Sequence, residues 1–283
     1  MEYLISRQDI NIFNGYSKEQ CRTGKHKIMN ALKTFVVLAS LIGLTLAEDY
    51  CNKDLCWYGT HVACGHNGQF AKTCPKDAAL VKIDQTLKDR IVADFNKKRN
   101  FIAGGGDSNH SPACRMATME WDDELAKLAE LNVKQCEMEH DDCHNTQSFP
   151  VSGQNLAWMT YFGTPHIPSL IDGSIQMWYD ELKDSSMKYI RSYHQHEENA
   201  VIGHFTAMVA DRNYRLGCAA STYTETGKDY SSFLFACNFA FTNVLDQPIY
   251  TDCAKAGTDC ATGANPKYPN LCSTSEKYKV TFF

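Results

Sequence analysis

Gly203-His204-Phe205-Thr206-Ala207-Met208-Val209 is the stretch of this sequence from which the rest of the chain can be interpreted. It places His204 on an apolar segment, where an imidazole needs a hydrogen-bond partner or a metal ion. Three upstream residues stand in comparable apolar settings and could meet that need, namely His140, Gln154 and Glu181. We therefore hypothesise that two histidines, an acid and an amide from separate segments converge on one cavity.

Four further motifs accompany this stretch. They are Trp121-Asp122-Asp123-Glu124-Leu125-Ala126, Gly153-Gln154-Asn155-Leu156, Trp178-Tyr179-Asp180-Glu181 and Phe235-Ala236-Cys237-Asn238. In this order, the five motifs resemble the signature of the CAP superfamily, which groups cysteine-rich secretory proteins, insect venom antigen-five proteins and plant pathogenesis-related proteins. The resemblance covers most of the chain from Tyr50 to about Phe241, and Tyr50-Cys51-Asn52 is similar to the insect antigen-five branch.

The spacing of apolar residues predicts a mixed α/β domain. Helices are expected over residues 84–101, 122–139 and 169–183, with a short one at 204–209. Alternating runs at 216–223 and 232–241 predict a β-hairpin, and residues 156–159 predict a strand or a strand entry. Asp84 should cap the first helix, Phe95 should lie in the core, and His140 should end the second helix. The resemblance, and not the periodicity, implies a three-layer α-β-α sandwich, the CAP/SCP fold, with a short cysteine-rich C-terminal extension.

The N-terminal residues carry the features of a secretory signal. An apolar run of about thirteen residues from Phe35 to Ala47 follows Lys33 and ends in small residues, and Met29 stands where such a peptide would start. The run is too short to span a bilayer, although a buried apolar helix is the alternative interpretation. We therefore interpret 1–47 as an upstream extension plus a signal peptide. No second long apolar run follows, so we expect a secreted chain without a membrane span.

Cysteine usage agrees with secretion. Thirteen cysteines are present, and removal of the signal region takes away Cys21 and leaves an even twelve. An even count in a secreted chain indicates disulfides, whereas the spacing of Cys51 and Cys56 would also suit a zinc pair. The resemblance implies the pairs Cys51–Cys64, Cys56–Cys143, Cys74–Cys136 and Cys218–Cys237. Four cysteines then remain, with three possible pairings: Cys114, Cys253, Cys260 and Cys272.

Charge argues against a nucleic-acid partner. Removal of residues 1–47 takes away six of the 28 basic and three of the 33 acidic residues, which changes the net charge from −5 to −8. No basic stripe remains that could follow a phosphate backbone. We expect a monomer whose partners are a sterol, a lipid, another small molecule or an extracellular protein.

The secreted part divides into a cysteine-rich N-terminal segment (48–83), a CAP/SCP domain (84–246) and a cysteine-rich C-terminal tail (247–283). Asn109-His110-Ser111 is a formal glycosylation sequon, although Pro112 follows it. Residues 189–201 carry a polar cluster that could mimic a metal site but is interpreted as a solvated loop. Its members are His194, His196, Glu197 and Glu198.

The resemblance implies a secreted, non-enzymatic binding protein built on a scaffold hardened by disulfides. Its ligands would be sterols, fatty-acid-like lipids, small amines or protein partners. The cavity residues carried over are His140, Gln154, Glu181 and His204. No cofactor is required, but His140, Glu181 and His204 could bind a divalent cation such as zinc with an open position. Relatives in several branches have glutamate where Gln154 stands, so the site lacks one negative charge.

Two other functions stay open. The first is a metal-assisted extracellular peptidase in which Glu181 acts as the base. Against it, the sequence contains no nucleophile-elbow motif and no His-Glu-x-x-His, and Gln154 cannot exchange protons. We therefore assign no catalytic residue. The second alternative is a secreted toxin-like or allergen-like effector that acts through its surface.

Overall fold

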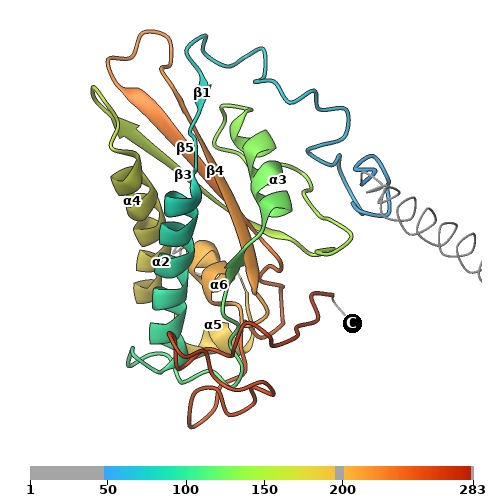
Figure 1. Cartoon of the computed structure of the whole chain (residues 1–283), viewed down its shortest axis with the longest axis vertical. Coiled ribbons are helices and arrows are strands. Elements are labelled where there is room, and N and C mark those ends of the chain that lie inside the picture. The colour runs from blue at the N-terminus through green and yellow to red at the C-terminus, as the bar shows by residue number, and fades with distance from the viewer. Residues whose placement is uncertain (1–47, 195–200, 282–283) are drawn as a thin grey trace, which may run out of the picture. The chain divides into compact units, whose positions relative to one another are not determined.

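A sheet with helices on both of its faces forms the centre of the fold (Figure 1). The structure, a computed structural model, describes residues 48–194 and 201–281. The predicted signal peptide, Cys21, Met29 and the residues His196, Glu197 and Glu198 lie outside this part of the chain.

The sheet contains five strands, and its longest members are neighbours. The strands are β1 (Ala79–Leu80), β2 (Glu120–Trp121), β3 (Gly153–Tyr161), β4 (Arg215–Tyr223) and β5 (Ser231–Phe239). Their order is β1-β4-β5-β3, with antiparallel pairing throughout, and β2 pairs parallel with β4. The predicted hairpin is therefore confirmed as β4 and β5, and the predicted strand at 156–159 is the middle of β3.

Two helical layers cover the sheet. The helices are α2 (Gln85–Ala103), α3 (Asp123–Val133), α4 (Ile167–Tyr179), α5 (Met187–Arg191) and α6 (Gly203–Val209), with a 3-10 turn η1 (Asp180–Asp184) after α4. In Figure 1, α2 and α4 lie on one side of the long strands and α3 lies on the other. The mixed α/β, three-layer fold implied by the family resemblance is thus confirmed.

The alternation of residues along β5 shows why two layers are needed. Phe233 and Phe235 pack into a core shared with α2, α4 and α6, whereas Leu234 and Ala236 pack into a second core with α3. Successive side chains of a strand point to opposite faces, so the continuous apolar run from Phe233 to Cys237 must be covered on both faces. Phe95 of α2 is fully buried in the first core, as predicted.

Two predicted helices end earlier than their apolar pattern suggests. The prediction that the second helix runs to residue 139 is wrong, because α3 ends at Val133 and Cys136 adopts a left-handed φ of 59° beside its disulfide to Cys74. His140 therefore lies in an irregular segment and not at a helix end. The third helix ends at Tyr179, so Glu181 stands on η1. The predicted cap of the first helix is confirmed, because Asp84 precedes α2 and accepts a hydrogen bond from the Leu87 N–H at 3.0 Å.

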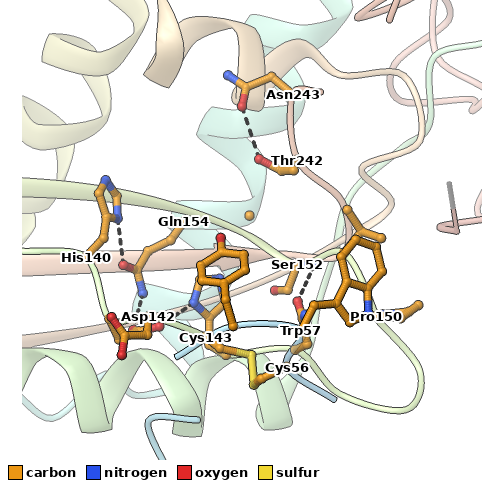
Figure 2. Close-up of a pocket in the computed structure, with 16 residues that line it drawn as sticks. Cys56, Trp57, His140, Asp142, Cys143, Pro150, Ser152, Gln154, Thr242 and Asn243 are labelled. Atoms are coloured by element: carbon orange, nitrogen blue, oxygen red, sulfur yellow. Dashed lines mark hydrogen bonds and ion pairs between the residues drawn. A yellow bond between two sulfur atoms is a disulfide. The ribbon is translucent and has the colours of Figure 1, made fainter. Parts of the chain in front are cut away.

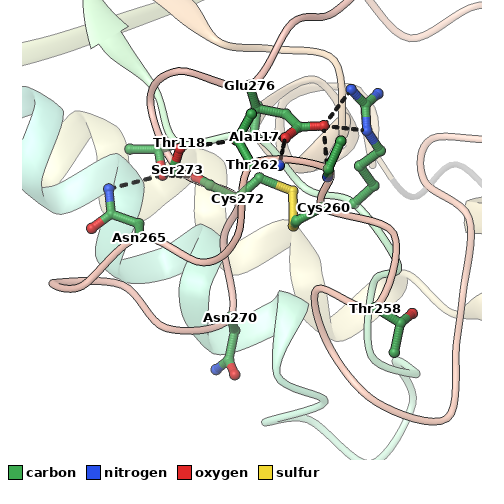
Figure 3. Close-up of a disulfide and its surroundings, with 12 residues drawn as sticks. Ala117, Thr118, Thr258, Cys260, Thr262, Asn265, Asn270, Cys272, Ser273 and Glu276 are labelled. Carbon is green, nitrogen blue, oxygen red and sulfur yellow. Dashed lines mark hydrogen bonds and ion pairs between the residues drawn. A yellow bond between two sulfur atoms is a disulfide. The ribbon is translucent and has the colours of Figure 1, made fainter.

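The described part of the chain contains six disulfides, one of which, Cys218–Cys237, joins β4 to β5. The four pairs that the family resemblance implies are present, and the open pairing is Cys114–Cys253 with Cys260–Cys272. Figure 3 shows the Cys260–Cys272 disulfide, beside the buried carboxylate of Glu276. Glu276 accepts hydrogen bonds from Thr262 Oγ1 at 2.6 Å and from Arg115 Nε at 2.7 Å. The tail from residue 247 is therefore tied to the body by covalent and polar contacts.

Candidate functional site

The sequence-predicted residues form two hydrogen-bonded pairs. Nδ1 of His140 lies 2.8 Å from Oε1 of Gln154, and Nδ1 of His204 lies 2.5 Å from Oε1 of Glu181. His140 comes from the irregular segment after α3, Gln154 from the start of β3, Glu181 from η1 and His204 from α6. Four separate elements thus supply the four side chains.

The hydrogen bonds of Gln154 define the tautomer of His140. The amide nitrogen of Gln154 donates to Asp141 Oδ2 at 2.8 Å and to Asn238 Oδ1 at 2.9 Å, which uses both of its protons. The amide oxygen therefore faces His140 and must accept, so the Nδ1 of His140 carries the proton. In the neutral imidazole this leaves a lone pair on Nε2.

The second pair is held in the same tautomer by a carboxylate. A carboxylate only accepts hydrogen bonds, so the Nδ1 of His204 donates to Glu181. The other oxygen of Glu181 accepts the Phe205 N–H at 2.9 Å. Trp178 stacks on His204 with the ring centroids 6.2 Å apart and an interplanar angle of 17°. Glu181 therefore orients His204 and has both of its oxygens engaged.

The buried carboxylate of Asp141 is hydrogen-bonded to the first pair through Gln154. We call the hydrogen-bonded series His144–Asp141–Gln154–His140 the polar floor. The oxygens of Asp141 accept hydrogen bonds from His144 Nδ1 at 2.6 Å, Gln154 Nε2 at 2.8 Å and Asn132 Nδ2 at 3.0 Å. Burial alone would raise the pKa of this carboxyl, but the charge of His144 and these three hydrogen bonds outweigh it and lower the pKa to about 2. Asp141 is therefore ionised, and it fixes two pocket side chains at once.

The His140–Gln154 pair lines a pocket with a volume of about 360 Å³ (Figure 2). Its walls come from residues 56–58 of the N-terminal segment, from the segment 140–145, from 150–154 and from Thr242 and Asn243. Small-molecule sites begin at about this size. The lining includes charged and amide side chains and two exposed aromatic residues, Trp57 and Tyr58.

Glu181 and His204 do not line this pocket, although they adjoin its wall. Asn155, the neighbour of Gln154, donates to the backbone oxygen of His204 at 3.1 Å, and the pocket residue Asn243 donates to that of Gly203 at 2.9 Å. Glu181 borders a separate surface hollow. The four residues thus form two hydrogen-bonded pairs, and of these only His140–Gln154 lines this pocket.

Ligand atoms of His140, Glu181 and His204 do not gather within 4.8 Å of one another. In the described chain, such a group consists only of Cys114, Cys253 and Asp259, and its two cysteines form a disulfide. Thiolates are what a metal binds, so this group is no metal site. Among the other predicted residues, Asn109 is exposed and His194 has its Nδ1 at 2.8 Å from the Ser192 oxygen.

Sequence reasoning missed the residues that complete the pocket. Asp141, His144, Asn243 and the pair Trp57–Tyr58 come from segments without helical or strand periodicity. One signal was present: Asp141 and His144 stand three residues apart on either side of Cys143, a cysteine expected to be bridged.

None of the helices described is long and apolar enough to cross a membrane.

Comparison with known proteins places this architecture in a family. The model of the cysteine-rich secretory protein family, CAP, matches residues 92–239. The chain is 38% identical over 251 residues to venom allergen-1 of Aedes albopictus, and the matched region covers 88% of this chain and 96% of that protein. It is 42% identical over 196 residues to the antigen 5 like allergen Cul n 1 of Culicoides nubeculosus, covering 66% of this chain and 89% of that protein.

A solved structure shares the fold. The crystal structure described as NaASP2 with Zn2+ superposes with a TM-score of 0.54 at 21% identity and covers 71% of this chain and 100% of that one. At this identity the likeness concerns the fold alone. The chain therefore belongs to the CAP family of cysteine-rich secretory proteins, and within that family it is similar to the venom allergens and antigen 5-like allergens of insects.

Proposed function

We propose that this protein is a secreted, non-enzymatic binding protein that holds a small ligand in the pocket beside His140. One observation carries the proposal. The polar floor of the pocket is already positioned by hydrogen bonds, through the series His144–Asp141–Gln154–His140. A floor fixed before the ligand arrives loses little side-chain entropy on binding.

We also propose that the two histidines can take a divalent cation such as zinc. Both Nδ1 atoms are occupied, by Gln154 and by Glu181, so each neutral ring offers Nε2 as a metal ligand. Residues that hold the remote ring nitrogen in this way raise the quality of an imidazole as a ligand. Because the ligand atoms of His140, Glu181 and His204 do not lie within 4.8 Å of one another, Glu181 would orient His204 and would not bind the ion itself. The two imidazoles would have to approach each other to hold the ion, which would then offer a Lewis-acidic contact to a ligand oxygen.

The same geometry supports binding over hydrolysis. A general base needs a carboxylate oxygen or an imidazole nitrogen within reach of the proton that it removes. Both oxygens of Glu181 are engaged, one by His204 and one by the Phe205 N–H. Gln154 stands where an acid could act, and an amide does not exchange protons at neutral pH.

Calorimetry with zinc on the secreted protein tests the cation part. His140→Ala and His204→Ala should each weaken zinc binding, and binding should fade as the pH falls through about 6.5, because zinc requires neutral imidazole. His66→Ala, in a loop away from the pocket, is the matched control and should bind zinc like the wild type. Unchanged binding in both pocket variants would move the cation elsewhere.

Mass spectrometry of small molecules that copurify with the secreted protein tests the ligand part. The proposal predicts a polar small molecule that is absent from a sample of a variant with a filled pocket, Ser152→Trp. A sterol or fatty acid retained equally by both samples would contradict a ligand site in this pocket.

A further inference from the structure

Asn67 and Gly68 form a turn whose groups are arranged for a reaction within the chain itself. Asn67 is exposed, and the two residues are the only Asn-Gly pair downstream of residue 47. In such a pair the backbone nitrogen of the glycine can attack the side-chain carbonyl carbon of the asparagine, because glycine has no Cβ to hinder the approach. Neither residue lines the pocket beside His140.

The nucleophile of this reaction is hydrogen-bonded to a base. The N–H of Gly68 donates to Nδ1 of His66 at 2.8 Å, a distance at which an imidazole can take the proton as the nitrogen attacks. Because Nδ1 accepts this hydrogen bond, the ring is neutral and its proton is on Nε2. Burial and the charge of Lys134 lower the pKa of His66 from its ordinary value of 6.5, against the opposing charge of Glu130. The neutral base is therefore the main form at pH 7.

The carbonyl group under attack is polarised by a neighbouring N–H. Oδ1 of Asn67 accepts the backbone N–H of Gln69 at 3.0 Å. A donor at this oxygen stabilises the negative charge that the oxygen gains as the nitrogen adds to the carbon. The space beside Gly68 is open, because its φ is 80° and a Cβ built there would meet nothing within 4 Å. Water from solvent can therefore reach the reacting atoms.

A lysine holds this turn in place from the end of α3. Nζ of Lys134 donates to the Gly68 oxygen at 2.7 Å, and the backbone oxygen of Lys134 accepts the N–H of Ala71 at 2.9 Å. Cys64 and Cys74, which flank the segment, are both in disulfides. The ammonium group of Lys134 also favours loss of a proton from the Gly68 nitrogen, because the negative charge develops beside it.

From this arrangement we propose that Asn67 is a site of self-modification, where the Gly68 nitrogen, with His66 as general base, converts the asparagine to aspartate and isoaspartate through a succinimide. The Gly68 N–H gives its proton to Nδ1 of His66 while a bond forms between the nitrogen and Cγ of Asn67. The Cγ–Nδ2 bond then breaks, and its nitrogen takes that proton and leaves as ammonia. One water molecule from solvent opens the ring at either carbonyl. No electrons are exchanged with another reactant, and the loop gains one carboxylate.

Peptide mapping by mass spectrometry of the purified protein, incubated at neutral pH, tests this assignment. The peptide that contains Asn67 should gain the mass difference between an amide and an acid, and chromatography should separate its aspartate and isoaspartate forms. His66→Asn should slow this conversion about a hundredfold, the lower end of what a positioned base contributes. Its amide oxygen can still accept the Gly68 N–H but cannot take the proton, so the turn is kept and the base is lost. Fragment spectra assign the change to residue 67.

His166→Asn is the matched control. Nδ1 of His166 also accepts a backbone N–H, from Ser169 at 3.3 Å, but no Asn-Gly pair stands beside it, so conversion of Asn67 should be unchanged. The pH profile gives a second readout. In the wild type the rate should fall as His66 is protonated and should change little above pH 7. In His66→Asn, where hydroxide must act as the base, it should rise about tenfold per pH unit.

Three results would overturn the proposal. Faster conversion in His66→Asn would show that the hydrogen bond to His66 protects the Gly68 N–H, and equal rates at neutral pH would show that the imidazole takes no part. Conversion in the reduced, unfolded chain but not in the native protein would show that the folded turn protects Asn67. None of these results bears on the proposed ligand pocket, which shares no residue with the turn.

Discussion

Nδ1 of His144 and Oδ1 of Asp141 lie 2.6 Å apart, and this hydrogen bond holds the His144 imidazole in the polar floor of the pocket. The other oxygen of Asp141 holds Gln154, and Gln154 in turn holds His140. One buried carboxylate therefore determines the position of two imidazoles that enter the pocket from the same irregular segment.

Asp141→Asn should lower the free energy of unfolding by roughly 2 kcal/mol at pH 7. The native pKa of about 2 lies below the unfolded value of 3.8, so this contribution is present above pH 4 and is lost as the pH falls through the native pKa. Urea unfolding of the wild type and the variant between pH 2 and pH 7 measures it. A stability difference that stays constant down to pH 2 would show that the charge of Asp141 is not what stabilises the floor.

Arg99→Met should destabilise α6 from its C-terminal end. The guanidinium of Arg99 is fully buried and donates to the backbone oxygens of Met208 at 2.7 Å and Ala210 at 2.9 Å, and its Nη2 donates to that of Ala117 at 2.8 Å. Methionine fills much of the volume but leaves these carbonyls unpaired, so we expect a loss of about 3 kcal/mol in urea unfolding. Lys97→Met, on the same helix, is the control and should cost far less, because Lys97 is exposed to solvent.

Glu276→Gln should loosen the C-terminal tail without disturbing the pocket. Burial would raise the pKa of Glu276, but hydrogen bonds from Thr262, Ala261 and Arg115 lower it to about 2, so the native carboxyl is ionised. The amide keeps the shape but cannot accept at both atoms. Hydrogen exchange should become faster around residues 258–276 and stay unchanged at 140–154. Equal protection of the tail in both proteins would indicate that the disulfides Cys114–Cys253 and Cys260–Cys272 hold the tail in place without the carboxylate.

Glu181→Gln tests the non-enzymatic assignment. A peptide-library digest read by mass spectrometry should give no cleavage above background for the wild type or the variant, with or without added zinc. The reason is that Glu181 already serves His204 and the Phe205 N–H. Cleavages made by the wild type and lost in Glu181→Gln would support a peptidase, whereas cleavages common to both would indicate a contaminating protease.

Local signals in the sequence predicted the scaffold well. The hairpin of β4 and β5 follows from alternation, and the start of α2 follows from the Asp84 cap, since both depend on residues close in the chain. The end of α3 could not be predicted, because the apolar stripe continues to Cys136 while the disulfide to Cys74 turns the backbone away. A crosslink over 62 residues leaves no local trace.

The site was predicted only in part for the same reason. His140, Gln154, Glu181 and His204 were found through family motifs, and the structure brings them together in pairs. Trp57 and His144 line the same pocket and stand next to Cys56 and Cys143, whose disulfide spans 87 residues, so neither could be assigned to a pocket from its neighbours in the sequence.

Long-range ¹H–¹⁵N NMR of the histidine side chains, recorded on the purified protein before and after addition of zinc, tests the central claim most directly. The account predicts that His140 and His204 are protonated on Nδ1, and that zinc shifts their Nε2 signals while the Nδ1 protons remain. The opposite tautomer in the zinc-free protein, or Nε2 signals of both rings unchanged by zinc, would contradict it.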